Sequence, residues 1–228
     1  MAEGLSISLN GGQQGEGSAS SASRIVQMVA LITILSLAPG ILVMMTSFTR
    51  IIVVLSLLRT AIGMQQSPPN AVMTSFAMFL TAFIMAPTME KAYNEGIAPM
   101  IKEEVNEMDG LMKAANPFRQ FMLKHAREKD LQMFSNLAEV KPKTIEETPF
   151  QVVIPAFMIS ELRRAFEIGF LIFMPFLIID MVVASILMAM GMMMLPPATI
   201  SLPFKIIFFV LVDGWHLIAG SLVRSYGG

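Results

Sequence analysis

Three long intervals of this sequence contain no charged residue, and they limit the possible folds more than any other feature. The intervals are residues 25–49, 60–89 and 181–204. Each is long enough for a helix of roughly 20 residues, the length that crosses a hydrocarbon layer about 30 Å thick. Charged residues make up 14% of the chain, whereas soluble domains carry about 25%. The sequence therefore predicts an integral membrane protein.

The composition argues against several classes of function. The chain contains no cysteine, which excludes disulfides, thiolate metal sites and cysteine nucleophiles. Its two histidines, His125 and His216, are far apart and lack the spacing of a metal site. A net charge of −1 gives no basic surface for nucleic acid. No nucleophile–base arrangement or phosphate-binding glycine loop is evident, so we expect no enzyme activity, catalytic residue, cofactor, metal or nucleic-acid partner.

The sequence divides into four parts. Residues 1–23 are rich in Gly, Ser, Gln and Ala and predict a flexible tail. Residues 24–86 predict a first apolar helical hairpin, and residues 150–228 predict a second one with a methionine-rich turn. Residues 87–149 carry eleven acidic and nine basic side chains and predict an amphipathic helical insert. Because no strand-like alternation persists, the expected fold class is all-α, with two kinked apolar hairpins flanking the insert.

Prolines mark the expected boundaries and kinks inside these parts. Pro39, Pro155 and Pro175 predict kinks, because proline removes a backbone hydrogen bond from a helix. Asn116-Pro117 predicts the cap and first turn of a second helix in the insert. The second hairpin is expected to have arms over residues 150–194 and 203–223. The apolar stripe expected in the second insert helix comprises Phe118, Phe121, Met122, Phe134 and Leu137.

Insertion and orientation are read from the charges near the first hairpin. The tail lacks the basic start and apolar stretch of a secretory signal, so either the first helix inserts the chain or a signal has already been removed. Arg50 and Arg59 lie between the first two apolar pieces, and basic short loops prefer the cytoplasm. This pattern predicts that the tail and the insert lie on the opposite, periplasmic side.

A methionine cluster runs into a double proline at residues 188–197. Five of the seven residues from Met188 to Met194 are methionine, and Pro196-Pro197 follows closely. Methionine is unbranched and polarisable, so it packs apolar surface without fixing one shape. Two interpretations remain open at this point. The cluster is either packing filler in an apolar helix or a deformable seal.

Several ionisable residues lie within apolar stretches, where contact with lipid costs at least about 2.5–3.5 kcal/mol each. Arg163 and Glu167, and Glu161 and Arg164, have the spacing of pairs within one helix. Asp180, Lys205 and Asp213 have no partner at helical spacing. These three need partners on another helix, in another copy or in another protein. A proton relay would also use such residues, whereas the Gly-x-Gly-Asp signature of an intramembrane aspartyl protease is absent at both aspartates.

Four blocks of the sequence carry a resemblance to a known family: Met44–Ile52, Phe176–Asp180, Met190–Ile200 and Leu202–Lys205. They are similar to the signature blocks of the FliP/SctR family, the export-gate proteins of flagellar and virulence type III secretion. The resemblance implies a subunit of the bacterial inner membrane and the flagellar basal body, with a cleaved signal peptide. It also implies a pentameric ring or shallow helix that assembles with FliQ and FliR, with FlhB and FlhA as further partners. This assembly would pass unfolded flagellar proteins.

The resemblance gives specific expectations for residues. Met192, Met193 and Met194 would form a gasket in the pore. We expect Glu161 and Lys205 to form ion pairs between subunits or between helices. Three insert residues are expected to contact an adjacent copy or to stabilise the single protomer: Phe121, Arg127 and Phe134.

One alternative function remains open from the residues alone. A self-contained ion-coupled transporter would use Asp180 and Asp213. Transporters of that kind often have repeated halves with broken helices at matching positions. The two hairpins share no evident repeat, which favours the gate.

Overall fold

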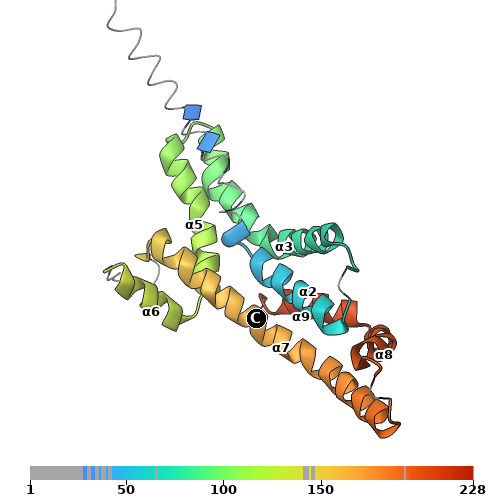
Figure 1. Cartoon of the computed structure of the whole chain (residues 1–228). Helices are drawn as coiled ribbons and strands as arrows, with labels where there is room; N and C mark the ends of the chain where they lie inside the picture. Colours follow the sequence, from blue (N-terminus) through green and yellow to red (C-terminus); the bar gives the residue numbers. More distant parts are fainter. Residues whose placement is uncertain are drawn as a thin grey trace, which may run out of the picture. The chain divides into compact units, whose positions relative to one another are not determined.

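The computed structural model in Figure 1 describes residues 28, 29, 32, 33, 36, 40, 43–64, 66–140, 144, 147–192 and 194–227. The chain divides into two units, residues 1–42 and 43–228, and every helix named below belongs to the second. The tail expected over residues 1–23 lies outside the described residues. Each regular element in the described ranges is a helix, and two helices are long and apolar enough to cross a membrane. These findings confirm the all-α, integral membrane fold class.

The first helical pair is formed by α2 (Phe48–Ile62) and α3 (Asn70–Ala92). Helix α2 ends at Gly63, whose φ of 89° lies in the left-handed region that glycine adopts without strain. Its backbone N–H donates to the carbonyl of Thr60 at 3.0 Å. The polar segment that follows leads into α3, which packs against α2.

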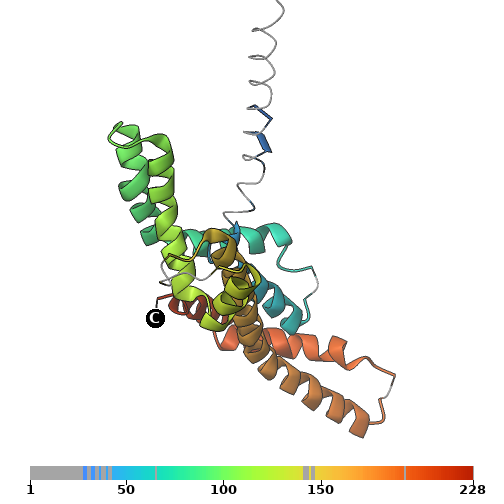
Figure 2. The ribbon, with the colours of Figure 1, turned by 90° about the vertical axis from the view of Figure 1, so that its left-hand side faces the viewer.

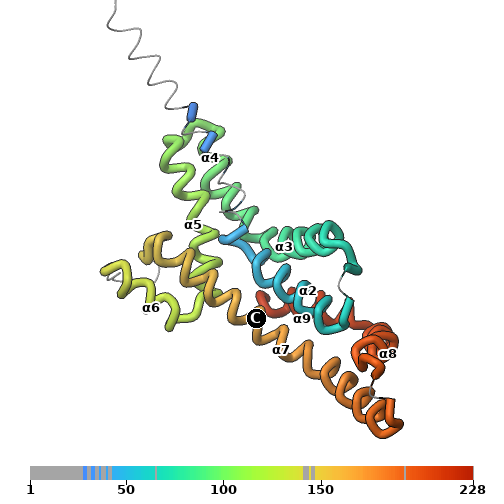
Figure 3. Tube along the Cα trace, in the orientation of Figure 1, coloured from blue at the N-terminus to red at the C-terminus, as the bar shows by residue number. Residues whose placement is uncertain are grey.

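Helix α3 does not end where the charged insert begins. Pro87 lies inside it, and a π-helical turn η1 (Tyr93–Ile97) and a short α4 (Ala98–Ile101) extend the rod. Residues 70–101 therefore form a continuous helix of 32 residues. It is followed by α5 (Glu107–His125), which returns alongside it (Figure 3). Thus the change in composition at residue 87 is not a boundary between helices.

The helices of the insert differ from those expected. Pro117 lies within α5 and does not start a new helix. The helix begins at residue 107, and the acidic side chains in its first turn interact favourably with the positive end of the helix dipole. A break at Ala126–Arg127 then separates α5 from α6 (Glu128–Leu137). The expected stripe is consequently divided: Met122 is fully buried, whereas Leu137 is 72% exposed.

Helix α7 (Phe150–Ala189) is the longest element, with 40 residues. At 1.5 Å per residue it is about 60 Å long, roughly twice the thickness of a hydrocarbon layer. It continues through Pro155 and Pro175 without a break. One half is therefore enough to cross a membrane, while the half near residue 150 packs on α5 and α6.

The returning arm of the second hairpin is divided into two helices. Helix α8 (Pro197–Leu211) starts six residues earlier than expected, because Pro197 occupies the first helical turn, where a missing N–H costs nothing. The helix ends near Asp213, whose φ of 50° turns the chain. Helix α9 (Gly214–Arg224) follows at an angle of 62°. The prediction of one continuous arm over residues 203–223 is therefore wrong.

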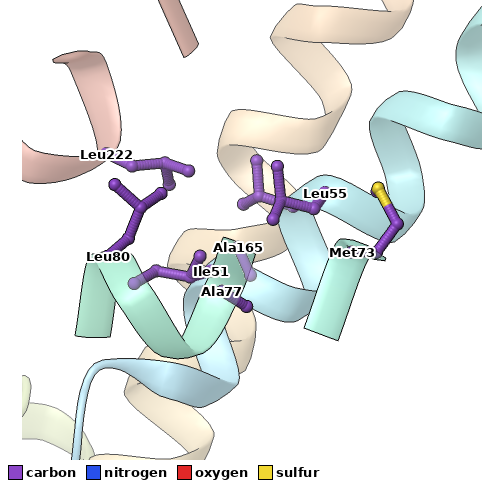
Figure 4. Packing of buried hydrophobic residues seen from close by; sticks show 8 residues of the cluster. Ile51, Leu55, Met73, Ala77, Leu80, Ala165 and Leu222 are labelled. Atoms are coloured by element: carbon purple, nitrogen blue, oxygen red, sulfur yellow. The ribbon is translucent and has the colours of Figure 1, made fainter. Parts of the chain in front are cut away.

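The main core lies where four helices meet. Figure 4 shows side chains of α2, α3, α7 and α9 interdigitating, with Ile51 and Leu55 at the centre. Helix α2 approaches α7 closely at Gly169, where an added Cβ would lie 2.3 Å from Leu57 Cδ1. Only 11% of the most apolar stretch of α7 is buried within the chain. The remaining apolar surface requires lipid or other protein subunits to cover it.

Candidate functional site

The methionine turn lies at the tip of the α7–α8 hairpin, far from the insert in both views (Figures 1 and 2). Met194 is 97% exposed and Met192 is 42% exposed. Met193 lies outside the described residues. Two further methionines at the end of α7, Met188 and Met190, are also mostly exposed. The turn therefore presents thioethers outward and does not pack them into the core of this protomer.

Backbone geometry explains why the chain turns here. Gly191 has a φ of 73°, and its N–H donates to the carbonyl of Met188 at 3.1 Å. The N–H of Met192 donates to the carbonyl of Leu187 at 3.0 Å, so the last carbonyls of α7 are satisfied. Pro196 precedes α8 and Pro197 begins it. Glycine and proline thus separate residues 192–195 from both helices.

A buried ion pair joins α2 to α7. Arg50 donates from Nε to Glu161 Oε2 at 2.9 Å and from Nη2 to Glu161 Oε1 at 2.5 Å. The two side chains are 1% and 0% exposed. Of the two pairs proposed within one helix, Arg163–Glu167 forms on the surface at 2.8 Å. Glu161 instead bonds to an arginine far away in the sequence, and its pairing with an adjacent copy remains a prediction.

The C-terminal end of the chain completes this cluster. The phenol of Tyr226 donates to Glu161, and its ring lies 3.8 Å below the guanidinium of Arg50. Arg50 also donates from Nη1 to the hydroxyl of Ser225 at 2.9 Å. Burial, followed by the nearby carboxylate, raises the pKa of Tyr226, so the phenol stays protonated and able to donate. Both Arg50 and Tyr226 were missed as site residues from the sequence.

The burial of Arg50 also affects the argument about orientation. A buried, paired arginine is not a free charge in a short loop, so Arg59 is the remaining basic side chain between the first apolar pieces. Arg59 donates to Asn70 Oδ1 at 2.5 Å and is only partly buried. The periplasmic location of the insert therefore remains a prediction with weaker support from charge.

A second ion pair joins α7 to α8. Lys205 Nζ lies 2.6 Å from Asp180 Oδ2, with the two side chains 8% and 34% exposed. The other oxygen of Asp180 accepts from Ser201 at 2.6 Å, and Lys205 also donates to the carbonyl of Ala61 at 3.2 Å. These contacts fix α8 against both α7 and the end of α2. The lysine and the aspartate neutralise each other inside one protomer.

Asp213 is not part of this pair. It occupies the residue before α9 with left-handed backbone geometry, and it is exposed. Within the described part of the chain, its carboxylate forms no hydrogen bond or ion pair; its backbone carbonyl accepts from Leu217 at 3.1 Å. The structure therefore does not bring Asp180 and Asp213 into a common polar cluster among the described residues.

The three insert residues make contacts within the protomer. The ring of Phe121 lies 4.7 Å from His125, 5.8 Å from Tyr226 and 5.9 Å from Phe157. Phe134 is partly buried on α6. Whether Phe121 and Phe134 also touch an adjacent copy remains a prediction.

Arg127 belongs to a polar group that links α6 to α7. Its guanidinium lies 2.7 Å from Asp130, and its backbone N–H donates to Ser160 Oγ at 2.9 Å. The Ser160 hydroxyl in turn donates to Asp130 Oδ2 at 2.6 Å. This group was missed from the sequence, because Ser160 lies in an apolar stretch and carries no charge. A contact of Arg127 with an adjacent copy also remains a prediction.

His125 lies in an environment that alters its titration. Burial, and then the charges of Arg50, Lys124 and Arg164, lower its pKa from 6.5 to about 4. Its imidazole is therefore neutral near pH 7. Among the described residues there is no group of His, Asp and Glu side chains that would hold a metal ion.

Comparisons with known proteins agree on one family. The model of the FliP family matches residues 31–222. The flagellar biosynthetic protein FliP of Caulobacter vibrioides is 62% identical over 204 residues, which cover 89% of this chain and 77% of that protein. The FliP protein of Bacillus subtilis is 53% identical over 205 residues, or 90% of this chain and 93% of the relative. That of Rhizobium meliloti is 53% identical over 208 residues, or 90% and 85%.

Proposed function

This chain belongs to the FliP family of flagellar biosynthetic proteins, and from that premise we propose that it is a pore-forming subunit of the flagellar protein export gate. Unfolded flagellar proteins would cross the inner membrane through a channel surrounded by several copies of the chain. Residues 192–194 of each copy would meet in that channel as a methionine gasket.

The exposed methionine turn is the observation that carries this proposal. A side chain such as Met194, with 97% of its surface exposed at the tip of a membrane-type hairpin, needs an apolar environment. Convergence of several copies would supply one, because each turn would cover the others. The thioethers would exclude water from the constriction, and hydrophobic constrictions gate by dewetting. Their flexibility would let the seal deform around a polypeptide of any sequence.

Assembly is supported by the large apolar surface that the protomer leaves uncovered. Helix α7 alone exposes phenylalanine, leucine, isoleucine and methionine side chains on several faces. More copies of this chain, together with FliQ and FliR, would cover part of it, and FlhB and FlhA would be further partners. In this arrangement the insert lies on the periplasmic side. Glu161, Lys205, Asp180 and Asp213 would serve to hold helices and subunits in place.

No observation favours the alternative of a self-contained ion-coupled transporter. Such a transporter needs a carboxylate that is free to bind and release its ion. Asp180 is held by Lys205 and Ser201. The carboxylate of Asp213 forms no bond among the described residues, but it lies at the exposed bend between α8 and α9 and shares no polar cluster with Asp180. A subunit whose charges fix its assembly fits these contacts better.

The seal is tested by changing its polarity at constant size. Replacing all three methionines by glutamine keeps the side-chain length but allows water to hydrate the constriction. We expect cells with M192Q/M193Q/M194Q to leak ions, measured as loss of the cytoplasmic pH gradient after assembly of the gate is verified. The triple leucine variant should stay tight, since leucine is equally apolar. The matched control is M78Q, on the exposed face of α3. A tight triple-glutamine gate would contradict the proposal.

A further inference from the structure

A polar cavity lies between α3 and α5, outside the methionine turn and both ion pairs. Its volume is about 260 Å³. Residues of α3 from Ile84 to Lys91 form one wall, and residues of α5 from Pro117 to His125 form the other. The ring of Tyr226, held by the buried Arg50–Glu161 pair, contributes to the lining.

The lining of this cavity is rich in hydrogen-bond donors and cations. It contains two lysines and no acidic residue among the described residues. Within the same described ranges, neither lysine forms an ion pair, and the glutamine and threonine beside them form no side-chain hydrogen bond. The polar groups are Thr88, Lys91, Gln120, Lys124 and His125.

His125 is the most informative of these groups. It is 6% exposed, yet in the described part of the chain neither ring nitrogen forms a hydrogen bond. Its ring is fixed between Phe121, at 4.7 Å, and Tyr226, at 5.0 Å. Among the described residues, the fully enclosed side-chain atom without a partner is Ser47 Oγ and not a nitrogen of His125, so the ring nitrogens are open to the cavity. A rigidly held imidazole with accessible nitrogens in a cavity wall is placed to bond to a ligand there.

The electrostatic surroundings indicate the sign of that ligand's charge. The charged and titratable groups around His125 are Arg50 of α2, Lys91 of α3, Lys124 of α5, and Glu161 and Arg164 of α7, with the phenol of Tyr226. Glu161 is neutralised by Arg50. After burial, the charges of Arg50, Lys124 and Arg164 are the causes that keep the pKa of His125 low. A neutral imidazole still donates one hydrogen bond, so the site combines positive charge with fixed donors.

The position of the cavity along α3 suggests where the ligand would come from. The charge-free interval of α3 ends at residue 89, level with the cavity. Before it lie Phe79 and Phe83, 71% and 64% exposed, as expected for a surface against acyl chains. The cavity is therefore at the transition from the apolar to the charged part of the helix, where the phosphate groups of lipids lie. Lysine side chains near a membrane surface attract the anionic headgroups of lipids.

We propose that this cavity binds a phosphate-type oxyanion, with Lys91 and Lys124 balancing its charge and His125, Gln120 and Thr88 donating hydrogen bonds. Either the headgroup of an anionic phospholipid or a free phosphate has this chemistry. The site is independent of the methionine gasket, so its test does not depend on whether the chain forms a pore.

His125 is also the probe for the test. The chain has only two histidines, so a full-length H216Q variant gives a single histidine signal in a ¹³C–¹H spectrum. The protein is placed in phosphatidylcholine nanodiscs, and the His125 signal is followed from pH 3.5 to 7.5. The additions are inorganic phosphate, sodium chloride at the same ionic strength, or phosphatidylglycerol in the disc. We expect the pKa to rise from about 4 to about 5 or higher with a bound oxyanion, because a nearby opposite charge shifts a pKa by about 1–3.

Variants separate a built site from general charge effects. K91Q/K124Q should abolish the shift, whereas K113Q, an exposed lysine on α5 outside the cavity, should leave it intact. A response to inorganic phosphate assigns a site for free anions, and a response to phosphatidylglycerol alone assigns a headgroup site. The proposal is overturned if neither phosphate source moves the signal, if chloride moves it equally, or if K113Q and K91Q/K124Q behave alike.

Discussion

Removing the carboxylate of Glu161 should destabilise the protomer more than any surface substitution. In E161A the guanidinium of Arg50, 1% exposed in the native pair, stays buried without its partner. Breaking a buried pair from one side costs about 3–5 kcal/mol, because the remaining charge is uncompensated. For a chain of this length, 1 kcal/mol corresponds to about 2–4 °C in Tm. The expected loss is therefore roughly 6–20 °C.

Two further variants identify the cause of this loss. Y226F removes one hydrogen bond to a charged group, worth about 1.5–3 kcal/mol, so its Tm should fall between those of E161A and the wild type. R50M/E161M removes both charges together and should be more stable than E161A, since apolar replacement of a whole buried pair is often neutral.

The measurement is thermal unfolding of the purified protein in mild detergent, with native gels to record assembly. The matched control is R163A, which breaks an exposed pair on the same helix and should leave the Tm unchanged. If E161A and R163A unfold at the same temperature, the buried cluster does not stabilise the fold as argued. If E161A keeps its Tm but loses assembly, Glu161 acts between subunits instead.

Three other outcomes are expected. The free energy of unfolding should fall by up to about 3 kcal/mol as the pH drops from about 6.5 to about 4. The reason is that His125 takes up a proton in the unfolded state over this range and not in the native state. The H125Q variant should lose this pH dependence in unfolding measurements, and H216Q should keep it. G96A should lower the Tm, because the new Cβ would lie 2.3 Å from a backbone nitrogen of α5, whereas G220A meets only the flexible end of a side chain at 3.5 Å and should not. K205A should leave its carboxylate partner unpaired on α7 and reduce the yield of assembled complex on native gels, and a normal yield would contradict the structural role of that pair.

The presence of long apolar helices was readable from the sequence because it depends on local composition, but their bounds were not. The charge-free interval 60–89 includes the connection between α2 and α3, and the interval 181–204 includes the turn between α7 and α8. Gly191 and Pro196-Pro197 favour a turn in the second of these intervals. The methionine turn at the tip of the α7–α8 hairpin follows from the same local rule.

Helix continuity was harder to predict. Pro87 and Pro117 lie inside α3 and α5, where the sequence favoured a boundary, whereas Pro155 and Pro175 lie inside the continuous α7, within the arm that was expected there. The break at Asp213, by contrast, carries no glycine or proline at the residue that turns. Proline alone is therefore a poor guide to helix ends in this protein.

The buried cluster was not readable because its members are far apart. Arg50 and Glu161 are separated by 111 residues, and a single sequence shows only pairs at helical spacing. Glu161 stood out as a charge in an apolar arm, but its partner had been interpreted as a loop charge. Tyr226 lies beyond the last apolar run and gave no signal. Tertiary packing, which joins the C-terminal residues to α2 and α7, decides these contacts.

The proposed gasket is tested most directly by locating the side chain of residue 194 in the working gate. A flagellar protein fused to a domain too stable to unfold should be arrested in the gate during export. A photo-reactive amino acid at position 194 should then cross-link to this arrested polypeptide. The same probe at Met181, exposed on the side of α7, should not. Cross-links from position 181 but none from position 194 would place the methionine turn outside the channel and contradict the account.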